Sequence, residues 1–108
     1  MARLSIDKDF RGDIEGVSRG EMISAGSGAE SSGGYVAMER VDGLLHGRHG
    51  TFILQHSSTM RRGTPTQSIT VVPDSATGEL EGLTGSMVII IEDKKHLYEF
   101  DYTISPEP

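Results

Sequence analysis

The feature that most restricts the fold of this chain is a two-residue alternation of apolar and polar side chains, which recurs along nearly its whole length. No segment sustains the spacing of three and four residues that marks an amphipathic helix. Alternation with a period of two places successive side chains on opposite faces of a strand. The chain is therefore expected to be all-β.

Seven segments carry this alternation, and turn-forming residues separate them. The predicted strands are 3–10, 13–25, 35–46, 49–59, 67–72, 86–92 and 96–104. Residues 79–83 are expected to form one short helical turn with Thr77 as its cap. Hairpins follow one another regularly over residues 1–108 without a linker. This spacing predicts one domain, a single antiparallel β-barrel of seven to eight strands, because closure removes exposed edges.

Composition limits the partners of such a domain. The 108 residues include 16 acidic and 10 basic side chains, a net charge of −6, which gives no attraction for phosphate backbones or anionic lipids. Neither nucleic acid nor membrane is therefore an expected partner. Cysteine is absent, and His46 and His49 flank a turn without an identifiable third ligand, so no cofactor and no metal site is predicted. The longest apolar run, 87–91, is too short to span a bilayer, and a cytoplasmic location is expected.

The predicted hairpin of 35–46 and 49–59 contains two polar side chains on its apolar face, Glu39 and His56. A two-residue turn at Gly47–Arg48 is predicted, which pairs His46 with His49 and places Glu39 directly opposite His56. Directly opposed residues in an antiparallel pair share a face. An acid and an imidazole are therefore expected together on a face that is otherwise apolar.

Alternation divides this part of the sheet into an apolar and a charged face. If the loop 26–34 brings Met22 opposite Ala37, the charged side chains of these strands point outward, as a barrel requires. The expected inward residues are Ile14, Gly16, Ser18, Gly20, Met22, Tyr35, Ala37, Glu39, Val41, Gly43, Phe52, Leu54 and His56. The small residues in this set are expected to leave room in the lumen. The loop itself is expected at the barrel mouth.

The last hairpin supplies aromatic side chains to the same interior. A turn at 92–95 pairs Ile91 with His96 and Ile89 with Tyr98, which points the aromatic side chains of 98–102 inward. A cavity with aromatic walls and a few polar groups is typical of a ligand site. The predicted ligand-binding residues are Ser18, Tyr35, Phe52, Leu54, Tyr98, Phe100 and Tyr102.

Four motifs resemble a known family. They are GVSRGEM at 16–22, GYVAMERVDG at 34–43, HGRHGTFILQHSSTM at 46–60 and VVPDSATGELEGLTG at 71–85. In this order, they resemble the bacterial family catalogued as domain of unknown function 3224, over almost the whole chain. The resemblance implies a barrel similar to that of allene oxide cyclases, in which 77–85 looks like the turn before a late strand. It implies no activity, because the family is uncharacterised.

Glu39 and His56 are the candidate catalytic residues. A carboxylate hydrogen-bonded to an imidazole fixes its tautomer and leaves the other ring nitrogen available as a base or an acid. Such a pair suits isomerisation or cyclisation of a small apolar substrate. The alternative is a buried polar pair that only satisfies its own hydrogen bonds and fixes the strand register.

Three functions remain open on this basis. The first is binding of a small apolar or aromatic metabolite in the lumen, and the second is an isomerase or cyclase that uses Glu39 and His56 for proton transfer. The third is a structural homo-oligomer with a filled barrel. Apolar side chains on the outward face could form a patch large enough to bury against another subunit, so self-association is expected. These outward residues are Val17, Ile23, Met38, Leu44, Ile53, Val72, Val88 and Ile90.

Overall fold

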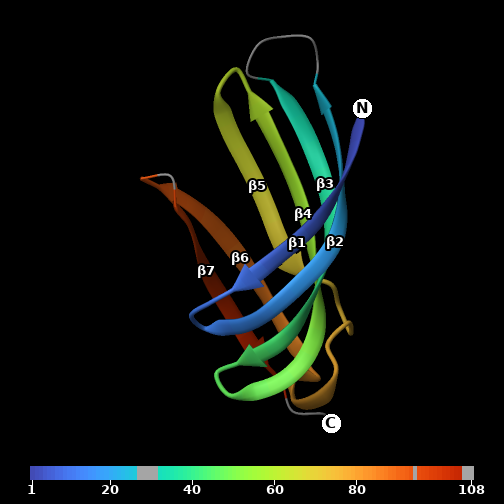
Figure 1. The fold of residues 1–108 in the computed structure, drawn as a ribbon, viewed down its shortest axis with the longest axis vertical. Helices are drawn as coiled ribbons and strands as arrows, with labels where there is room; N and C mark the ends of the chain where they lie inside the picture. Colours follow the sequence, from blue (N-terminus) through green and yellow to red (C-terminus); the bar gives the residue numbers. More distant parts are fainter. Residues whose placement is uncertain (27–31, 94, 106–108) are drawn as a thin grey trace.

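The computed structural model describes residues 1–26, 32–93 and 95–105, and most of the loop predicted at 26–34 lies outside these residues. The described part is all-β apart from one short 3₁₀ helix (Figure 1). Its elements are β1 (Ala2–Phe10), β2 (Ile14–Gly26), β3 (Gly33–Leu45), β4 (Arg48–Arg61), β5 (Thr64–Val71), η1 (Gly78–Leu80), β6 (Leu83–Glu92) and β7 (Lys95–Ile104). The strand prediction is confirmed, with boundaries that differ by a few residues.

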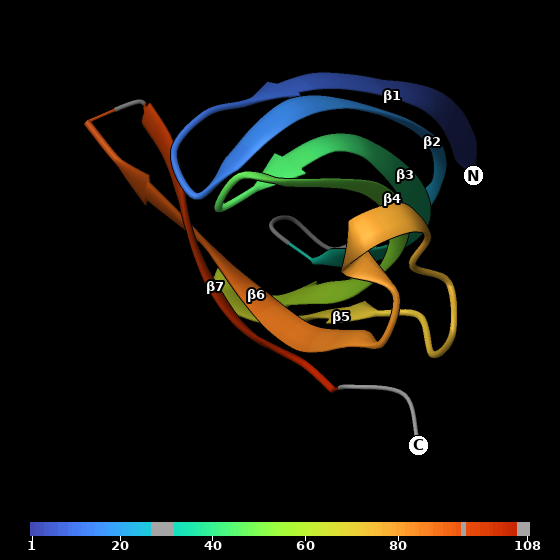
Figure 2. The same ribbon diagram turned by 90° about the horizontal axis from the view of Figure 1, so that it is seen from below.

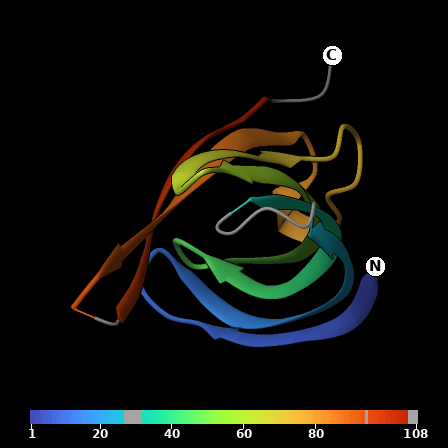
Figure 3. The ribbon, with the colours of Figure 1, turned by 90° about the horizontal axis from the view of Figure 1, so that it is seen from above.

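The strands form one antiparallel sheet whose spatial order, β1 to β7, is the order of the sequence. Figures 2 and 3 show this sheet curled around an interior, with β1 at one edge and β7 at the other. No strand pairing joins these edges within the part of the chain that the structure describes. The sheet is therefore open there, and the predicted closed barrel is not confirmed.

A side chain bridges the two edges near the β1–β2 turn. The Tyr98 hydroxyl on β7 donates a hydrogen bond to the carbonyl oxygen of Arg11 at 2.8 Å and accepts one from the Ile14 amide at 2.9 Å. These bonds hold the tip of the β1–β2 hairpin against β7. Figure 2 shows this turn next to β7. The sheet edges thus approach each other at one end through a side chain rather than through a strand ladder.

Two of the three predicted registers are confirmed. Met22 lies opposite Ala37 in the β2–β3 pair, and the inward side chains alternate with exposed ones along both strands. Ile91 lies opposite His96 and Ile89 opposite Tyr98 in the β6–β7 pair. The division into an inner and an outer face is therefore the one predicted.

The register of the β3–β4 hairpin is different, and its prediction is wrong. Glu39 lies opposite Leu54, while His56 lies opposite Ala37. The turn residues are His46 and Gly47, with φ of +48° and +82°, because a two-residue hairpin turn of this kind needs positive φ at both positions and favours glycine at the second. The pairing shifts by two residues, so Glu39 and His56 keep the same face and meet diagonally.

The core lies inside the curl toward the η1 end. Leu80 of η1 is fully buried and inserts among inward side chains of the sheet. The buried cluster consists of Ile14, Val41, Leu45, Phe52, Leu54, Ile69, Val71, Leu80, Leu83 and Met87. Thr77 occupies the position before η1, as predicted, but it makes no side-chain cap, because its hydroxyl lies 2.6 Å from that of Thr51 on β4.

Glycines on the inner face of β2 and β3 do not open a lumen. A Cβ atom built on Gly20 would lie 2.0 Å from the Met38 carbonyl oxygen, and one on Gly16 would lie 2.3 Å from that of Asp42. Real Cβ atoms essentially never come so close, so the backbones of β2 and β3 occupy this space. The expectation that these glycines leave room is therefore wrong; they allow the close approach of strands in the curled sheet.

The pairing between β5 and β6 is short, and the side chain of one residue extends it. Only Ile69 with Met87 and Thr70 with Ser86 are paired among the described residues of these strands. Beyond them, the side-chain oxygen of Gln67 accepts a hydrogen bond from the backbone N–H of Ile89 at 3.0 Å. The side-chain nitrogen of Gln67 donates one to the backbone carbonyl oxygen of Ile89 at 3.4 Å. Gln67 thus substitutes for a strand pair and fixes the backbone of Ile89.

The outward apolar residues are exposed to different degrees. Ile53, Val72 and Ile90 are half-buried. Those that are exposed are Val17, Ile23, Met38, Leu44 and Val88. Self-association through this face stays a prediction. In the described ranges, no helix has the length and hydropathy to cross a membrane.

Candidate active and binding site

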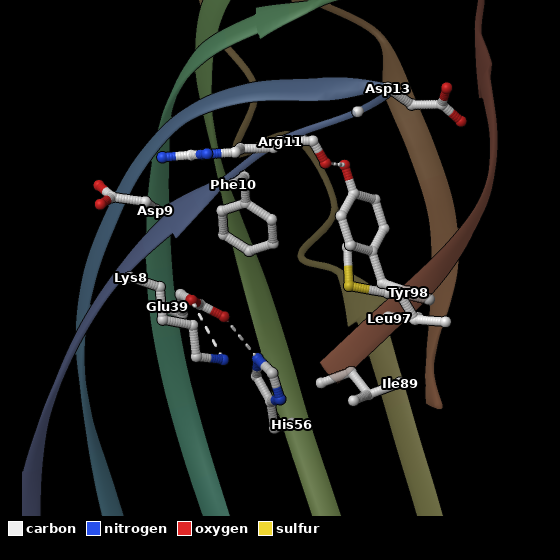
Figure 4. Close-up of a pocket in the computed structure, with 12 residues that line it drawn as sticks. Lys8, Asp9, Phe10, Arg11, Asp13, Glu39, His56, Ile89, Leu97 and Tyr98 are labelled. Carbon is white, nitrogen blue, oxygen red and sulfur yellow. Dashed lines mark hydrogen bonds and ion pairs between the residues drawn. The ribbon is translucent and has the colours of Figure 1, made fainter. Parts of the chain in front are cut away.

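A cavity of about 560 Å³ lies between the two edges of the sheet (Figure 4). The end of β1 and the β1–β2 turn form one side, β6 and β7 form the other, and single residues of β3 and β4 complete the lining. The lining residues are Lys8, Asp9, Phe10, Arg11, Gly12, Asp13, Glu39, His56, Met87, Ile89, Leu97 and Tyr98. Because the sheet is open here, the cavity lies where a closed barrel would have its seam.

Glu39 is the most enclosed polar group of the site. Its side chain is 0% exposed, and three donors surround its carboxylate. Ser18 donates to Oε2 at 2.5 Å, His56 Nε2 lies 2.8 Å from Oε1, and Lys8 Nζ lies 3.5 Å from Oε2. Figure 4 shows Lys8 and His56 converging on Glu39 from β1 and β4. A buried carboxylate is stable only with such partners.

These contacts determine the ionisation of Glu39. Burial by itself raises the pKa of the Glu39 carboxyl, but the hydrogen bonds from His56 and Ser18 and the positive charge of Lys8 outweigh it. The pKa consequently lies below its ordinary value of 4.5, and Glu39 is a carboxylate at neutral pH. A carboxylate only accepts hydrogen bonds, so the proton in the contact with His56 is on Nε2.

The other ring nitrogen of His56 faces the cavity. Among the described residues Nδ1 has no hydrogen-bond partner, and no fully buried side-chain nitrogen or oxygen there lacks one. Nδ1 therefore retains access to the cavity that His56 lines, although the side chain is only 4% exposed. In the neutral ring this nitrogen holds a lone pair, which can accept a hydrogen bond or remove a proton.

The walls above this polar pair are apolar. Phe10 and Tyr98 contact each other edge to face, with ring centroids 5.6 Å apart, and Met87 and Ile89 line the cavity from β6. The Tyr98 hydroxyl is engaged by the backbone of the β1–β2 turn, so only its ring is offered to the cavity. Charged residues of the β1–β2 turn, such as Arg11, form the rim.

The predicted site residues lie in three places. Glu39, His56 and Tyr98 line the cavity, and Ser18 is buried behind Glu39. Phe52 and Leu54 are buried in the core, and Phe100 stacks on Phe52 at 5.9 Å. Tyr102 stacks on Phe100 at 5.2 Å, and Tyr35 is half-buried on β3 outside the lining.

Sequence reasoning missed one whole side of the cavity. Lys8, Phe10 and Arg11 come from β1 and its turn, for which no pairing was predicted. The short turn at Arg11–Asp13 could have supplied that register, because it pairs Lys8 with Ser18 and thereby brings the lysine to the inner face. Met87 and Ile89 were assigned to the inner face with their hairpin but were not named as ligand contacts.

The outer histidines pair with single carboxylates. His46 Nε2 lies 3.7 Å from Asp13, and His49 Nε2 lies 3.3 Å from Asp42. Within the described ranges, no group of three or more potential metal-ligating side chains of histidine, cysteine, aspartate or glutamate is present.

The family model described as "Protein of unknown function (DUF3224)" matches residues 1–102 of the chain. The chain belongs to this family. A DUF3224 protein of unknown function from Shewanella oneidensis MR-1 has a crystal structure that is similar, with 47% sequence identity and a TM-score of 0.95. The match covers 97% of the present chain and 78% of the Shewanella chain.

Membership in DUF3224 confirms the resemblance drawn from the four motifs. No curated protein matches the chain. The resemblance to allene oxide cyclases is not shown by these matches and stays a prediction. The family and its solved structure thus support the fold, while the activity has to be argued from the cavity itself.

Proposed function

We propose that this DUF3224 protein binds a small apolar or aromatic molecule in the cavity between β1 and β7. The observation that carries the proposal is the cavity of about 560 Å³ with apolar walls and the buried Glu39–His56 pair in its lining. Cavities of this size, with a few convergent polar groups, are the usual form of small-molecule sites.

Burial of the polar pair favours a ligand over a purely structural role. Ser18 and Lys8 both contact Oε2 of Glu39, whereas His56 is the donor to Oε1. Donation to Glu39 uses Nε2 alone. The open Nδ1 beside a cavity of this size is what favours a ligand. The open nitrogen gives a ligand one oriented hydrogen bond, and the apolar walls supply the remaining contact area.

Indole is a suitable probe, because it combines an aromatic body with one N–H donor. We expect indole to bind the wild-type protein, and we expect Ile89→Trp to weaken binding at least about tenfold by filling the cavity with a larger side chain. Val88→Trp is the matched control, since Val88 directly precedes Ile89 on β6 and is 49% exposed on the outer face. Isothermal titration calorimetry measures both affinities.

Two outcomes would contradict binding in the cavity. One is the absence of indole binding by the wild-type protein together with absence of binding for other small aromatic probes such as nitrobenzene. The other is equal loss of affinity in Ile89→Trp and Val88→Trp when both variants keep the wild-type circular dichroism spectrum.

A second candidate function is proton transfer on a small substrate, of the isomerase or cyclase kind. The observation in its favour is the Nε2 contact of His56 with the Glu39 carboxylate at 2.8 Å, which leaves Nδ1 as a base toward the cavity. The probe 5-nitrobenzisoxazole opens to a coloured nitrophenolate when a base removes its C–H proton. This function predicts a rate above buffer that His56→Ala abolishes and the outer control His49→Ala retains; a rate equal to buffer would contradict it.

A further inference from the structure

We propose that the natural ligand of the cavity is a weak acid, a phenol or an enol on an apolar ring, which binds as its anion. This inference rests on the proposed binding function and adds the chemical class of the ligand. On binding, the ligand O–H bond breaks and an N–H bond forms at Nδ1 of His56. The negative charge of the oxygen then faces the imidazolium and the Lys8 ammonium.

Lys8 and His56 reach the same part of the cavity from opposite sides of the Glu39 carboxylate. Lys8 and His56 contact different oxygens of the same carboxylate, Oε2 at 3.5 Å and Oε1 at 2.8 Å, and both side chains line the cavity. Their remaining hydrogen-bonding capacity therefore lies close together, on the cavity side of Glu39. Lys8 has three N–H donors and Nδ1 accepts or donates according to its protonation, a combination that fits an acidic hydroxyl and its anion.

The charge balance of Lys8, Glu39 and His56 favours a weak acid over a permanent anion as the ligand. The negative charge of Glu39 is compensated by Lys8, so the empty site is neutral when His56 is neutral. A permanent anion without its own proton would leave an uncompensated negative charge next to the buried carboxylate of Glu39, which is costly. An acid that gives its proton to His56 keeps the site neutral, because one cation and one anion form together.

Other charged groups face the site from its rim. Asp9, Arg11 and Asp13 line the cavity from the β1–β2 turn, and Asp13 has an ion-pair contact with His46 at 3.7 Å. Tyr98 is the ionisable residue of β7 that lines the cavity, and its hydroxyl is held by the backbone. The two aspartates and the arginine leave one net negative charge on the rim, so the cations that face a ligand anion beside Glu39 are Lys8 and, once protonated, His56.

The test compares 4-nitrophenol with its methyl ether, 4-nitroanisole. The two share an aromatic body, but only the phenol has a proton to give, and its phenolate absorbs visible light. We expect the phenol to bind about tenfold more tightly than the ether near neutral pH, as a charge-assisted hydrogen bond would give. We also expect the bound phenol to ionise at a lower pH than in buffer, so that the phenolate band grows when protein is added below the phenol's solution pKa.

Variants assign this effect to the proposed groups. Lys8→Met and His56→Ala should remove the preference for the phenol over the ether while both probes still bind. Arg40→Met is the control for Lys8→Met, because Arg40 is an exposed cation on β3 that faces outward. It should retain the full preference.

The outcomes separate this inference from the binding function. Equal affinities of the wild-type protein for the phenol and the ether, without growth of the phenolate band, would overturn the inference and leave the binding function standing. Failure of the wild-type protein to bind either probe or indole would overturn both. The wild-type comparison needs no variant, so the test holds even if a substitution prevents folding.

Discussion

The variant Gly20→Ala is expected to unfold much more easily than the wild-type protein. A methyl group at this position would lie 2.0 Å from the carbonyl oxygen of Met38 and 2.7 Å from the Cα atom of Glu39. Both contacts are with backbone, which cannot rotate away, so β2 and β3 must separate next to the buried carboxylate. Overpacking of this kind costs about 3 kcal/mol. Urea denaturation followed by circular dichroism measures the loss of unfolding free energy.

Gly26→Ala is the matched control for this prediction. Gly26 ends the same strand, and a Cβ atom there would have no neighbour within 4 Å among the described residues. Alanine at this site should change stability by less than about 1 kcal/mol. A Gly20→Ala protein as stable as Gly26→Ala would show that the two strands do not approach as closely as the structure has them.

The variant Glu39→Leu is expected to have a similarly large effect, for an electrostatic reason. Leucine removes the acceptor of the Ser18 hydroxyl and of His56 Nε2, both of which are buried. Removal of one partner from a buried charged network costs about 3–5 kcal/mol, because the other groups lose their hydrogen bonds without regaining water. Glu15→Leu is the control, since Glu15 is exposed on β2. Equal stability of the two variants in urea would contradict the buried network.

The pH dependence of this effect follows from the pKa of Glu39. Its pKa in the folded protein lies below the ordinary 4.5, so ionised Glu39 stabilises the fold in full above that pH. The contribution is lost as the pH falls through the lower folded pKa. The stability difference between the wild type and Glu39→Leu should therefore narrow on acidification below pH 4.5 and stay constant just above it. A difference that widens in acid would contradict the lowered pKa.

The faces of the strands could be predicted from the sequence because side-chain direction depends only on the parity of the register. Of the two glycine-containing turns available at His46–Arg48, the prediction used Gly47–Arg48 and the structure uses His46–Gly47. The resulting shift is two residues, an even number, so Glu39 and His56 remained on one face. The wrong turn position therefore gave the wrong residue pairs in the β3–β4 hairpin but the correct face for Glu39 and His56.

The shape of the cavity could not be predicted, since it depends on contacts between residues far apart in the sequence. The bond between the Tyr98 hydroxyl and the Arg11 carbonyl joins residues 87 positions apart and leaves no periodic signal in the sequence. Lys8 lies on the inner face of the sheet although its side chain is 41% exposed, and the pairing of β1 with β2 places it there. Whether the sheet closes depends on how strongly it curls, and the alternation of apolar and polar residues does not specify this.

The most direct test of the account is the ¹⁵N NMR spectrum of the His56 ring at neutral pH, recorded with and without indole. We expect the neutral ring to carry its proton on Nε2, held by Glu39, and the resonance of its bare Nδ1 to move when indole is added. His49, exposed on β4, provides the internal reference and should not respond. A neutral ring with its proton on Nδ1, or ring resonances that saturating indole leaves unchanged, would contradict this expectation.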